Sequence, residues 1–347
     1  MNSDLTNNFK IDMKLLNGIG LGTFPFASPF TKVDESEALN IVTTYINGGG
    51  KYIDTAPTYA FGEIENLLGK ILKKFKRDDF FINTSCGFVR QGNGYVKSGR
   101  YKDVIQDCEE SLFRLGLNEI DLYISHTPDT ETGTPFSETI TALEDLKKQG
   151  KIKAIGVSNV SLEQLKEYNQ TNSVEYIQNR FSLLNQNLDK DFIDYCMNNK
   201  IGIVAFQVIE RGILTEKFIA ENVELSENDL RNKKPEFRKD VRNVIKNWVK
   251  EDLLPISIHY DLPLSALAIK WALSNDYIAL CQCGATNSKQ VLNNLKSIQN
   301  DNIKVIGEIN IAYNKLSDFL LKEYQQNIID FLGISIKDTL KGSATGK

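Results

Sequence analysis

Three side chains in this sequence carry groups suited to acid–base chemistry. Asp54 and His126 each stand at the end of a short apolar run, and Tyr59 follows Asp54 by five residues. A carboxyl, a phenol and an imidazole are common general acids and bases. Other runs end in a similar way, mostly in polar residues: Ser85, Cys86, Ser158, Asn159, Gln178, Asn179, Phe206, Gln207 and Gly284. Packing alone does not require polar groups at so many run ends, which favours one shared site.

The elements that must position these residues are short strands alternating with helices. Eight apolar runs suit strands buried on both faces, at residues 19–21, 52–54, 80–84, 122–125, 154–157, 176–178, 202–206 and 278–283. Helical patterns lie between them, and the clearest is the apolar stripe Ile64, Leu67, Leu68, Ile71, Leu72 and Phe75. Repeated strand–helix units imply parallel strands, and eight of them predict a closed (β/α)8 TIM barrel. Active sites in such barrels form at the carboxyl ends of the strands, where these residues stand.

The whole chain, residues 1–347, is expected to form one barrel domain, because no Pro/Gly/Ser-rich linker divides it. The polar stretch 221–239 is expected to be a long loop on the barrel rim. Residues from about 303 to 340 exceed what eight units need, and they predict an additional C-terminal helical segment. The tail 342–347 is expected to be disordered.

Composition and charge exclude several classes of function. The net charge is −4, from 41 basic and 45 acidic residues, which argues against nucleic-acid binding. No apolar stretch reaches the length of a membrane helix, about 18 residues, so no membrane partner is expected. The polar N-terminus lacks the apolar core of a signal peptide, and the five cysteines are scattered. Together these features predict a reduced, cytoplasmic setting.

Two short patterns have plain structural interpretations. Cys281 and Cys283 lack a second Cys/His pair, so we interpret them as small apolar residues on a strand and expect no metal site. The run Gly48–Gly50 precedes a strand, whereas a phosphate loop follows one, so it predicts a helix stop and a turn.

Several longer motifs occur together and in a recognisable order. They are DTAPTYAFGEIENLLG (54–69), DLYISHTPD (121–129), GVSNVSLEQL (156–165), VEYIQNRFSLLN (174–185), RGILTEKF (211–218), DLR (229–231) and CGATNSKQVLNNL (283–295). The chain thereby resembles the aldo-keto reductase family over residues 16–298, most of its length.

The resemblance implies hydride transfer between a nicotinamide and the carbonyl carbon of a small aldehyde or ketone, sugar-like compounds included. It makes Tyr59 the proton donor, Asp54 the partner of a lysine, and His126 the group that orients the carbonyl. The implied cofactor-binding residues are Gly22, Thr23, Ser158, Asn159, Gln178, Phe206, Gln207, Gly284, Thr286, Lys289, Gln290 and Asn294. Lys289 would meet a 2′-phosphate, so NADPH is the expected cofactor and NADH the alternative.

One position departs from the family pattern. In INTSCGF (82–88), Ser85 stands where the family places its catalytic lysine. A neutral hydroxyl does not lower the pKa of a phenol, so Tyr59 is expected to keep a pKa of about 10 or to exceed it beside Asp54. The proton then comes from a weaker acid or from another group. Arg90, Lys97, His126 and an amine of the substrate are the candidates.

Three functions therefore stay open. The leading one is an NAD(P)H-dependent oxidoreductase acting on an aldehyde or ketone. The second is a catalytically impaired, cofactor-binding barrel that acts as a sensor or subunit, which the serine favours. The third is a barrel that uses Asp54, Tyr59 and His126 for a non-redox acid–base reaction.

Overall fold

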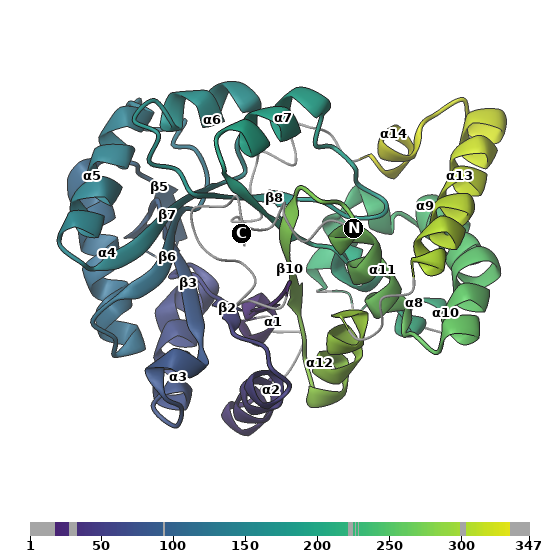
Figure 1. The fold of residues 1–347 in the computed structure, drawn as a ribbon, viewed down its shortest axis with the longest axis horizontal. Coiled ribbons are helices and arrows are strands. Elements are labelled where there is room, and N and C mark those ends of the chain that lie inside the picture. The colour runs from purple at the N-terminus through teal and green to yellow at the C-terminus, as the bar shows by residue number, and fades with distance from the viewer. Residues whose placement is uncertain are drawn as a thin grey trace.

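A computed structural model describes residues 18–27, 33–92, 94–220, 225, 227, 229–298 and 303–333. Within this part of the chain, eight parallel strands close into a barrel with helices around it (Figure 1). The strands are β1 (Ile19–Gly22), β2 (Tyr52–Asp54), β3 (Phe81–Cys86), β6 (Ile120–Ser125), β7 (Ile152–Ser158), β8 (Tyr176–Arg180), β9 (Gly202–Phe206) and β10 (Ile278–Gly284). Their order around the barrel is β1-β10-β9-β8-β7-β6-β3-β2. The expected (β/α)8 fold is confirmed.

Helices follow the strands and cover the outside of the barrel. They are α1 (Phe24–Ala27), α2 (Glu35–Asn47), α3 (Glu63–Leu72), α4 (Tyr101–Leu115), α5 (Phe136–Lys148), α6 (Leu162–Tyr168), α7 (Lys190–Asn198), α8 (Glu216–Ile219), α9 (Lys239–Trp248), α10 (Leu254–Tyr260), α11 (Leu264–Leu273) and α12 (Ser288–Leu295). Sequence sets their ends: the Asp34 side chain caps α2, and Gly48 ends it. The helix stop expected at the glycine run is confirmed there.

Large side chains fill the lower part of the barrel interior. Tyr52, Leu122, Ile124, Ala154, Tyr176, Val204 and Leu280 form one buried cluster. Two of its tyrosines lie close to glycines of neighbouring strands. A Cβ on Gly20 would lie 2.6 Å from the Tyr52 ring, and one on Gly202 would lie 2.7 Å from the Tyr176 ring. The cluster is therefore a solid floor beneath the carboxyl ends of the strands.

The polar stretch 221–239 is not a plain loop, so that expectation was wrong for part of it. Residues 230–233 and 235–237 form short 3-10 helices, and α9 begins at Lys239. Glu236 is buried here because Arg180 and Arg211 pair with it, and Arg180 also pairs with buried Glu210. Paired charges satisfy one another when removed from water, which lets a polar segment pack against the barrel.

A hairpin that the sequence analysis did not anticipate follows β3. Strands β4 (Phe88–Gln91) and β5 (Gly94–Lys97) pair antiparallel and form a separate two-stranded sheet. The base of the hairpin is closed by a hydrogen bond from the Ser98 N–H to the Gly87 carbonyl oxygen, 3.0 Å long. Because it continues from the carboxyl end of β3, the hairpin stands at the mouth of the barrel.

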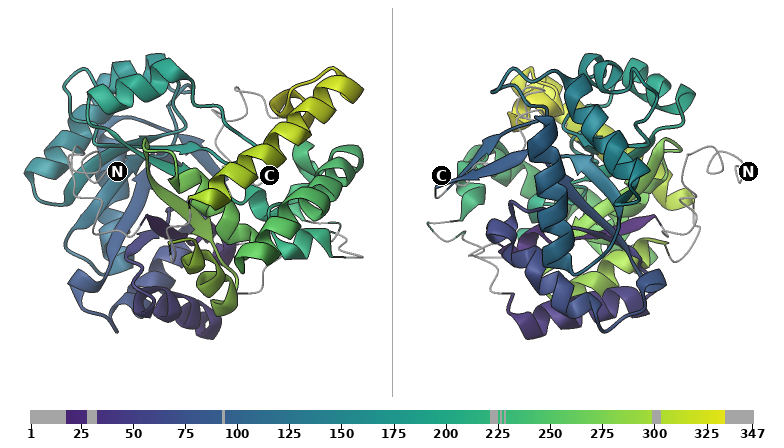
Figure 2. Two further views of the ribbon diagram at one scale, coloured as in Figure 1. Left: turned by 45° about the vertical axis from the view of Figure 1, so that its right-hand side comes forward. Right: turned by 90° about the vertical axis from the view of Figure 1, so that its left-hand side faces the viewer.

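Two helices occupy the described part of the C-terminal segment, α13 (Lys304–Tyr324) and α14 (Ile328–Leu332). They lie on the side of the barrel away from α4 and α5 (Figures 1 and 2). The Trp248 indole donates a 2.8 Å hydrogen bond to the Ala312 carbonyl oxygen, which ties α13 to α9. Residues 334–340 of the expected segment, and the tail 342–347, lie outside the described residues. No helix among the described residues is long and apolar enough to cross a membrane.

Candidate active site

The polar residues lie one layer above the apolar floor because inward-facing positions of a strand recur every second residue. Asp54 stands two residues beyond Tyr52, and Gln178 two beyond Tyr176. The same step leads from Leu280 to Gln282 on β10. On these three strands the inward side therefore changes from apolar to polar within one step of two residues.

The Asp54 carboxylate is surrounded by side-chain amides. Asn83 donates a 2.5 Å hydrogen bond to its Oδ2 and Gln178 a 3.0 Å hydrogen bond to the same oxygen, while Gln282 donates one of 2.5 Å to Oδ1. No lysine or arginine of the described residues pairs with this carboxylate, which is only 3% exposed. Burial raises the pKa of Asp54 to about 7, and the amide hydrogen bonds oppose that rise.

Ser85 and His126 form the second pair in the site. Ser85 Oγ and His126 Nδ1 share a hydrogen bond of 2.8 Å. Burial lowers the pKa of His126 to about 4, so the imidazole is neutral at neutral pH. The ring of Phe88 lies edge-on to the imidazole, with 5.4 Å between ring centres. The imidazole is therefore held in place by a hydrogen bond with a hydroxyl and by contact with an aromatic ring.

Tyr59 lies in a backbone segment with unusual geometry. It begins the 3-10 turn Tyr59–Gly62, in which Ala60 and Phe61 have φ angles of 47° and 56°. Two successive non-glycine residues in the left-handed region are costly, and such strain often accompanies functional sites. Burial and the neighbouring Asp54 charge raise the pKa of Tyr59 well above its ordinary value. The phenol is therefore neutral across the physiological range.

Three residues expected to hold a nicotinamide carboxamide lie together between β7 and β8. The Ser158 hydroxyl donates a 2.7 Å hydrogen bond to the Gln178 carbonyl oxygen. The Asn159 amide donates one of 2.9 Å to the His126 carbonyl oxygen. Asn159 itself has a φ of 57°, which turns the chain sharply at the strand end. These bonds connect the amide-bearing strand ends to the strand that carries the imidazole.

The rim next to β9, β10 and β1 has features that fit a dinucleotide. The Gln207 Oε1 atom, next to Phe206 at the end of β9, is buried and has no hydrogen-bond partner among the described residues. Buried polar atoms are nearly always satisfied, so this one is free to receive a ligand donor. Gly22 and Gly284 end neighbouring strands, and a Cβ on Gly284 would lie 2.6 Å from Pro25. The Gly284 backbone is thus packed closely against Pro25, which leaves no room for a side chain at this position.

The other residues expected to bind the cofactor lie on or just before α12, except Thr23. Thr286 donates through its backbone N–H to Gln290 Oε1 at 2.8 Å, which folds the turn onto the helix. Lys289 is exposed in the first turn, where a helix N-terminus attracts anions. Asn294 is buried near the other end of the helix. Thr23 lies apart, donating to the Asp54 carbonyl oxygen at the end of β2.

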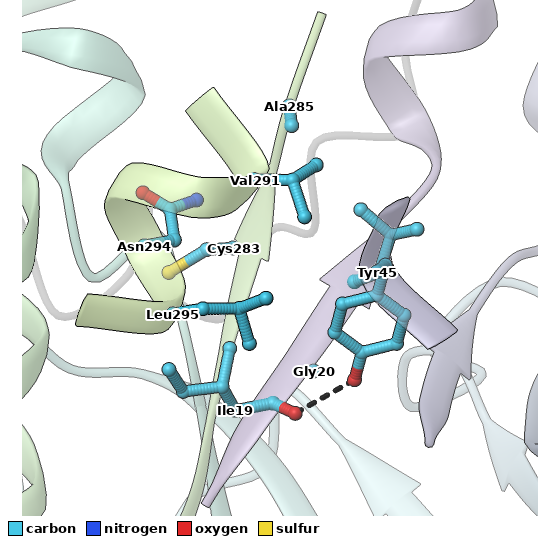
Figure 3. A pocket seen from close by; sticks show the side chains of 9 residues that line it. Ile19, Gly20, Tyr45, Cys283, Ala285, Val291, Asn294 and Leu295 are labelled. Carbon is cyan, nitrogen blue, oxygen red and sulfur yellow. Dashed lines mark hydrogen bonds between the residues drawn. The ribbon is translucent and has the colours of Figure 1, made fainter. Parts of the chain in front are cut away.

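A small cavity near this helix is not part of the barrel mouth. It lies between β1, α2 and α12, where Tyr45, Val291, Asn294 and Leu295 line it (Figure 3). Its volume is about 10 Å³, room for a single water at most. The Tyr45 hydroxyl beside it donates to the Ile19 carbonyl oxygen at 2.8 Å. The cavity is a packing defect of the outer layer and has no room for a substrate.

Some residues that the sequence analysis did not predict contact Asp54 or His126, and two that it did predict form no ion pair with Asp54. Asn83 and Gln282 complete the amide cage, and Phe88 reaches the imidazole from the hairpin. Arg90 and Lys97, the expected cationic substitutes, lie on the hairpin and form no ion pair with Asp54. No group of three or more metal-binding side chains occurs among the described residues.

Comparison with known proteins decides the family. A sequence profile of the aldo/keto reductase family matches residues 18–312. The chain belongs to the aldo/keto reductase family. It is therefore an oxidoreductase of a family that uses NAD(P)H for carbonyl chemistry.

Curated relatives agree with this assignment. The NADH-specific methylglyoxal reductase of Escherichia coli (strain K12) is 29% identical over 301 residues, which cover 82% of this chain and 90% of that protein. Aldo-keto reductase YhdN of Bacillus subtilis (strain 168) is 30% identical over 275 residues, 79% of this chain and 82% of the relative. Among solved structures, glycerol dehydrogenase AKR11B4 from Gluconobacter oxydans superposes with a TM-score of 0.75 at 24% identity, covering 89% of this chain and 92% of that one. The last comparison supports the barrel fold.

Proposed function

We propose that this aldo/keto reductase reduces the carbonyl group of a small aldehyde or ketone with NADPH, and that Tyr59 supplies the proton. The observation that supports this proposal is a pair of hydrogen bonds at the carboxyl ends of the strands, one between Ser85 and His126 and one from Gln178 to Asp54. A family member with a neutral imidazole and a neutral phenol at this point has the groups that carbonyl reduction needs.

Each residue of the chain has a separate task in this proposal. The bound nicotinamide supplies the hydride. His126, neutral and fixed by Ser85, donates a hydrogen bond that orients the carbonyl oxygen. Tyr59 gives that oxygen its proton, and Asp54 stands nearby to influence the phenol. Since no lysine or arginine of the described residues neutralises Asp54, the phenol is a weak acid and turnover is expected to be slow.

The residues of the rim would hold the cofactor. Ser158, Asn159 and Gln178 would bind the carboxamide, and Phe206 would stack on the ring. The orphaned Gln207 oxygen and the backbone beyond Gly284 would face the phosphate-bearing part. Lys289 would meet the 2′-phosphate of NADPH, which favours NADPH even though one relative is named as NADH-specific.

A fluorescence titration with NADPH and then NADH tests this proposal. Trp248 and Trp271 are the two tryptophans of the chain, and their emission can transfer to a bound nicotinamide. We expect micromolar binding, NADPH before NADH, and a Lys289→Gln variant that weakens NADPH binding about tenfold and leaves NADH unchanged. Methylglyoxal and butanal then serve as substrates in a spectrophotometric assay. A folded protein that binds neither nucleotide would overturn the proposal.

A second function has one observation in its favour: among the residues that the structure describes, the cage of neutral amides around Asp54 includes no cation. Such a site suits a protein that binds the cofactor and turns over little substrate, such as a sensor. Substituting Ser85→Lys separates the two functions, because a lysine ammonium on β3 would lower the pKa of both Asp54 and Tyr59. A large gain in turnover supports the sensor, whereas a loss means that serine has a positive role in reduction.

A further inference from the structure

The hairpin β4–β5 presents a chemically distinct face. Phe88 lies opposite Lys97 and Arg90 opposite Tyr95 in the antiparallel register. Directly opposed residues point to the same side of a sheet, and so do alternate residues of one strand. These four residues therefore share one side of the hairpin, here called the basic hairpin face. It combines two aromatic rings with two cations.

The basic hairpin face is turned toward the barrel mouth. The Phe88 ring lies 5.4 Å from the His126 ring. The Tyr95 ring stacks on Phe61, two residues after Tyr59 in the chain, with 5.2 Å between the ring centres. The Tyr95 hydroxyl also donates a 2.8 Å hydrogen bond to a backbone carbonyl oxygen in the loop after β2. The face is thus attached to both segments that carry the acid–base residues.

The two cations on this face differ in how far they are neutralised. The Arg90 guanidinium lies over the Phe61 ring, 5.0 Å from its centre, and pairs with no carboxylate of the described residues. Lys97 Nζ lies 3.9 Å from Glu131, whose side chain is 54% exposed, so that pairing is weak. A guanidinium resting on a ring keeps its planar set of donors free at the edge, the geometry that carboxylates and phosphates accept.

We propose that the basic hairpin face binds an anionic group, a carboxylate or a phosphate monoester, at the end of the substrate remote from its carbonyl. This inference rests on the proposed function, since it places the reacting carbonyl beside His126. Phe88 and Arg90 are two residues apart, about 7 Å along the strand. A chain of a few carbon atoms spans such a distance, and the Phe88 and Tyr95 rings offer it an apolar surface.

The test compares substrates that differ only in the anion. One pair is 4-oxobutanoate with butanal, and the other is glyceraldehyde 3-phosphate with glyceraldehyde. The full-length protein is expected to prefer at least one anionic substrate over its neutral partner by about tenfold in kcat/KM, mainly through a lower KM. A hydrogen bond to a charged group contributes enough binding free energy for a difference of this size. The larger preference identifies whether carboxylate or phosphate is the natural group.

Three variants assign the preference to the hairpin. Arg90→Gln should abolish it and leave the neutral aldehydes within about twofold. Arg90→Lys keeps the charge without the planar donor set and should restore part of it. Lys102→Gln, at an exposed position of α4, removes the same charge elsewhere and should change nothing. Thermal unfolding of each variant shows whether the fold is kept.

The outcomes separate this inference from the proposed function. Equal losses on anionic and neutral aldehydes in the Arg90→Gln variant, or no preference in the unaltered protein, would overturn the anion site while carbonyl reduction stands. If no aldehyde is reduced, the proposed function fails and calorimetric titration with 4-hydroxybutanoate and glycerol 3-phosphate decides the inference alone. Binding of either anion that Arg90→Gln weakens at least fivefold would support the site, and absent or unaltered binding of both would refute it.

Discussion

Replacing Asp54 with asparagine should change how the stability of this protein depends on pH. The pKa of Asp54 is raised from 3.8 to about 7 by burial. Below pH 4 the carboxyl is protonated in both the folded and the unfolded chain, so it has no effect there. Between pH 4 and pH 7 the unfolded chain ionises first, and the folded state loses stability. Above pH 7 both states are ionised and the loss is constant.

The size of the effect follows from the shift. The rise in the pKa of Asp54 from 3.8 to about 7 corresponds to a loss of about 4 kcal/mol in the free energy of unfolding at pH 8. Asp54→Asn removes the titrating group and keeps its shape. One of the three surrounding amides must then turn to present its oxygen to the new amide nitrogen, as it must for a protonated carboxyl. We therefore expect the variant to be more stable than the unaltered protein at pH 8 by a few kcal/mol, and about equal to it at pH 4.

Urea unfolding at intervals from pH 4 to pH 8 measures this difference. At each pH the free energy of unfolding of the variant is compared with that of the unaltered protein, because the other carboxyl groups titrate in both and their effect cancels. Asp145→Asn is a suitable control, since Lys148 holds the pKa of this exposed carboxyl below its ordinary value and the sign of its small effect is opposite. If the stability difference between Asp54→Asn and the unaltered protein stays the same from pH 4 to pH 8, the inference that burial raises the pKa of Asp54 is refuted.

Three further variants test other contacts. Ser85→Ala removes the hydrogen bond to His126 and should lower kcat/KM for aldehydes about five- to tenfold, about 1 kcal/mol; an unchanged value in steady-state assays would show that the imidazole is held by packing alone. Gln282→Leu removes the donor to Asp54 Oδ1 and should raise the pKa of that carboxyl further, so that the loss of stability with rising pH continues to a higher pH than in the unaltered protein; a loss that ends at a lower pH would contradict the cage. Gly69→Ala places a Cβ 2.5 Å from a backbone carbonyl oxygen of α4 and should cost about 1–3 kcal/mol in thermal unfolding, whereas an unchanged Tm would mean that α3 shifts freely.

The barrel was predictable from the sequence because its signal is repeated. Each apolar run that was expected to be a strand is one, with ends displaced by at most two residues. Asp54 and His126 were found because they end such runs. Gln282 was missed because it lies inside a run that was interpreted as wholly buried. The alternation of Leu280, Gln282 and Gly284 on the inward side was the signal that would have revealed it.

Other parts needed contacts that the sequence does not display. The hairpin escaped notice although the sequence has Gly92–Asn93 between its two strands, and a two-residue connection of this type is a hairpin signal. The polar stretch around Glu236 was interpreted as solvated because its arginine partners come from distant segments. Ionic pairing between residues far apart in the chain has no periodic pattern, so composition alone misjudges such burial.

The solid floor of the barrel also sets a limit on how this enzyme can change. The rings of Tyr52 and Tyr176 lie close to Gly20 and Gly202, so a side chain added at either glycine would displace a buried ring or a strand. Deepening the pocket would also destabilise the fold, since shortening a buried aromatic residue leaves a cavity that lowers the free energy of unfolding by about 3–5 kcal/mol. New substrates are thus accommodated by altering the rim, where the hairpin and the strand-end loops are free to vary while the barrel beneath stays constant.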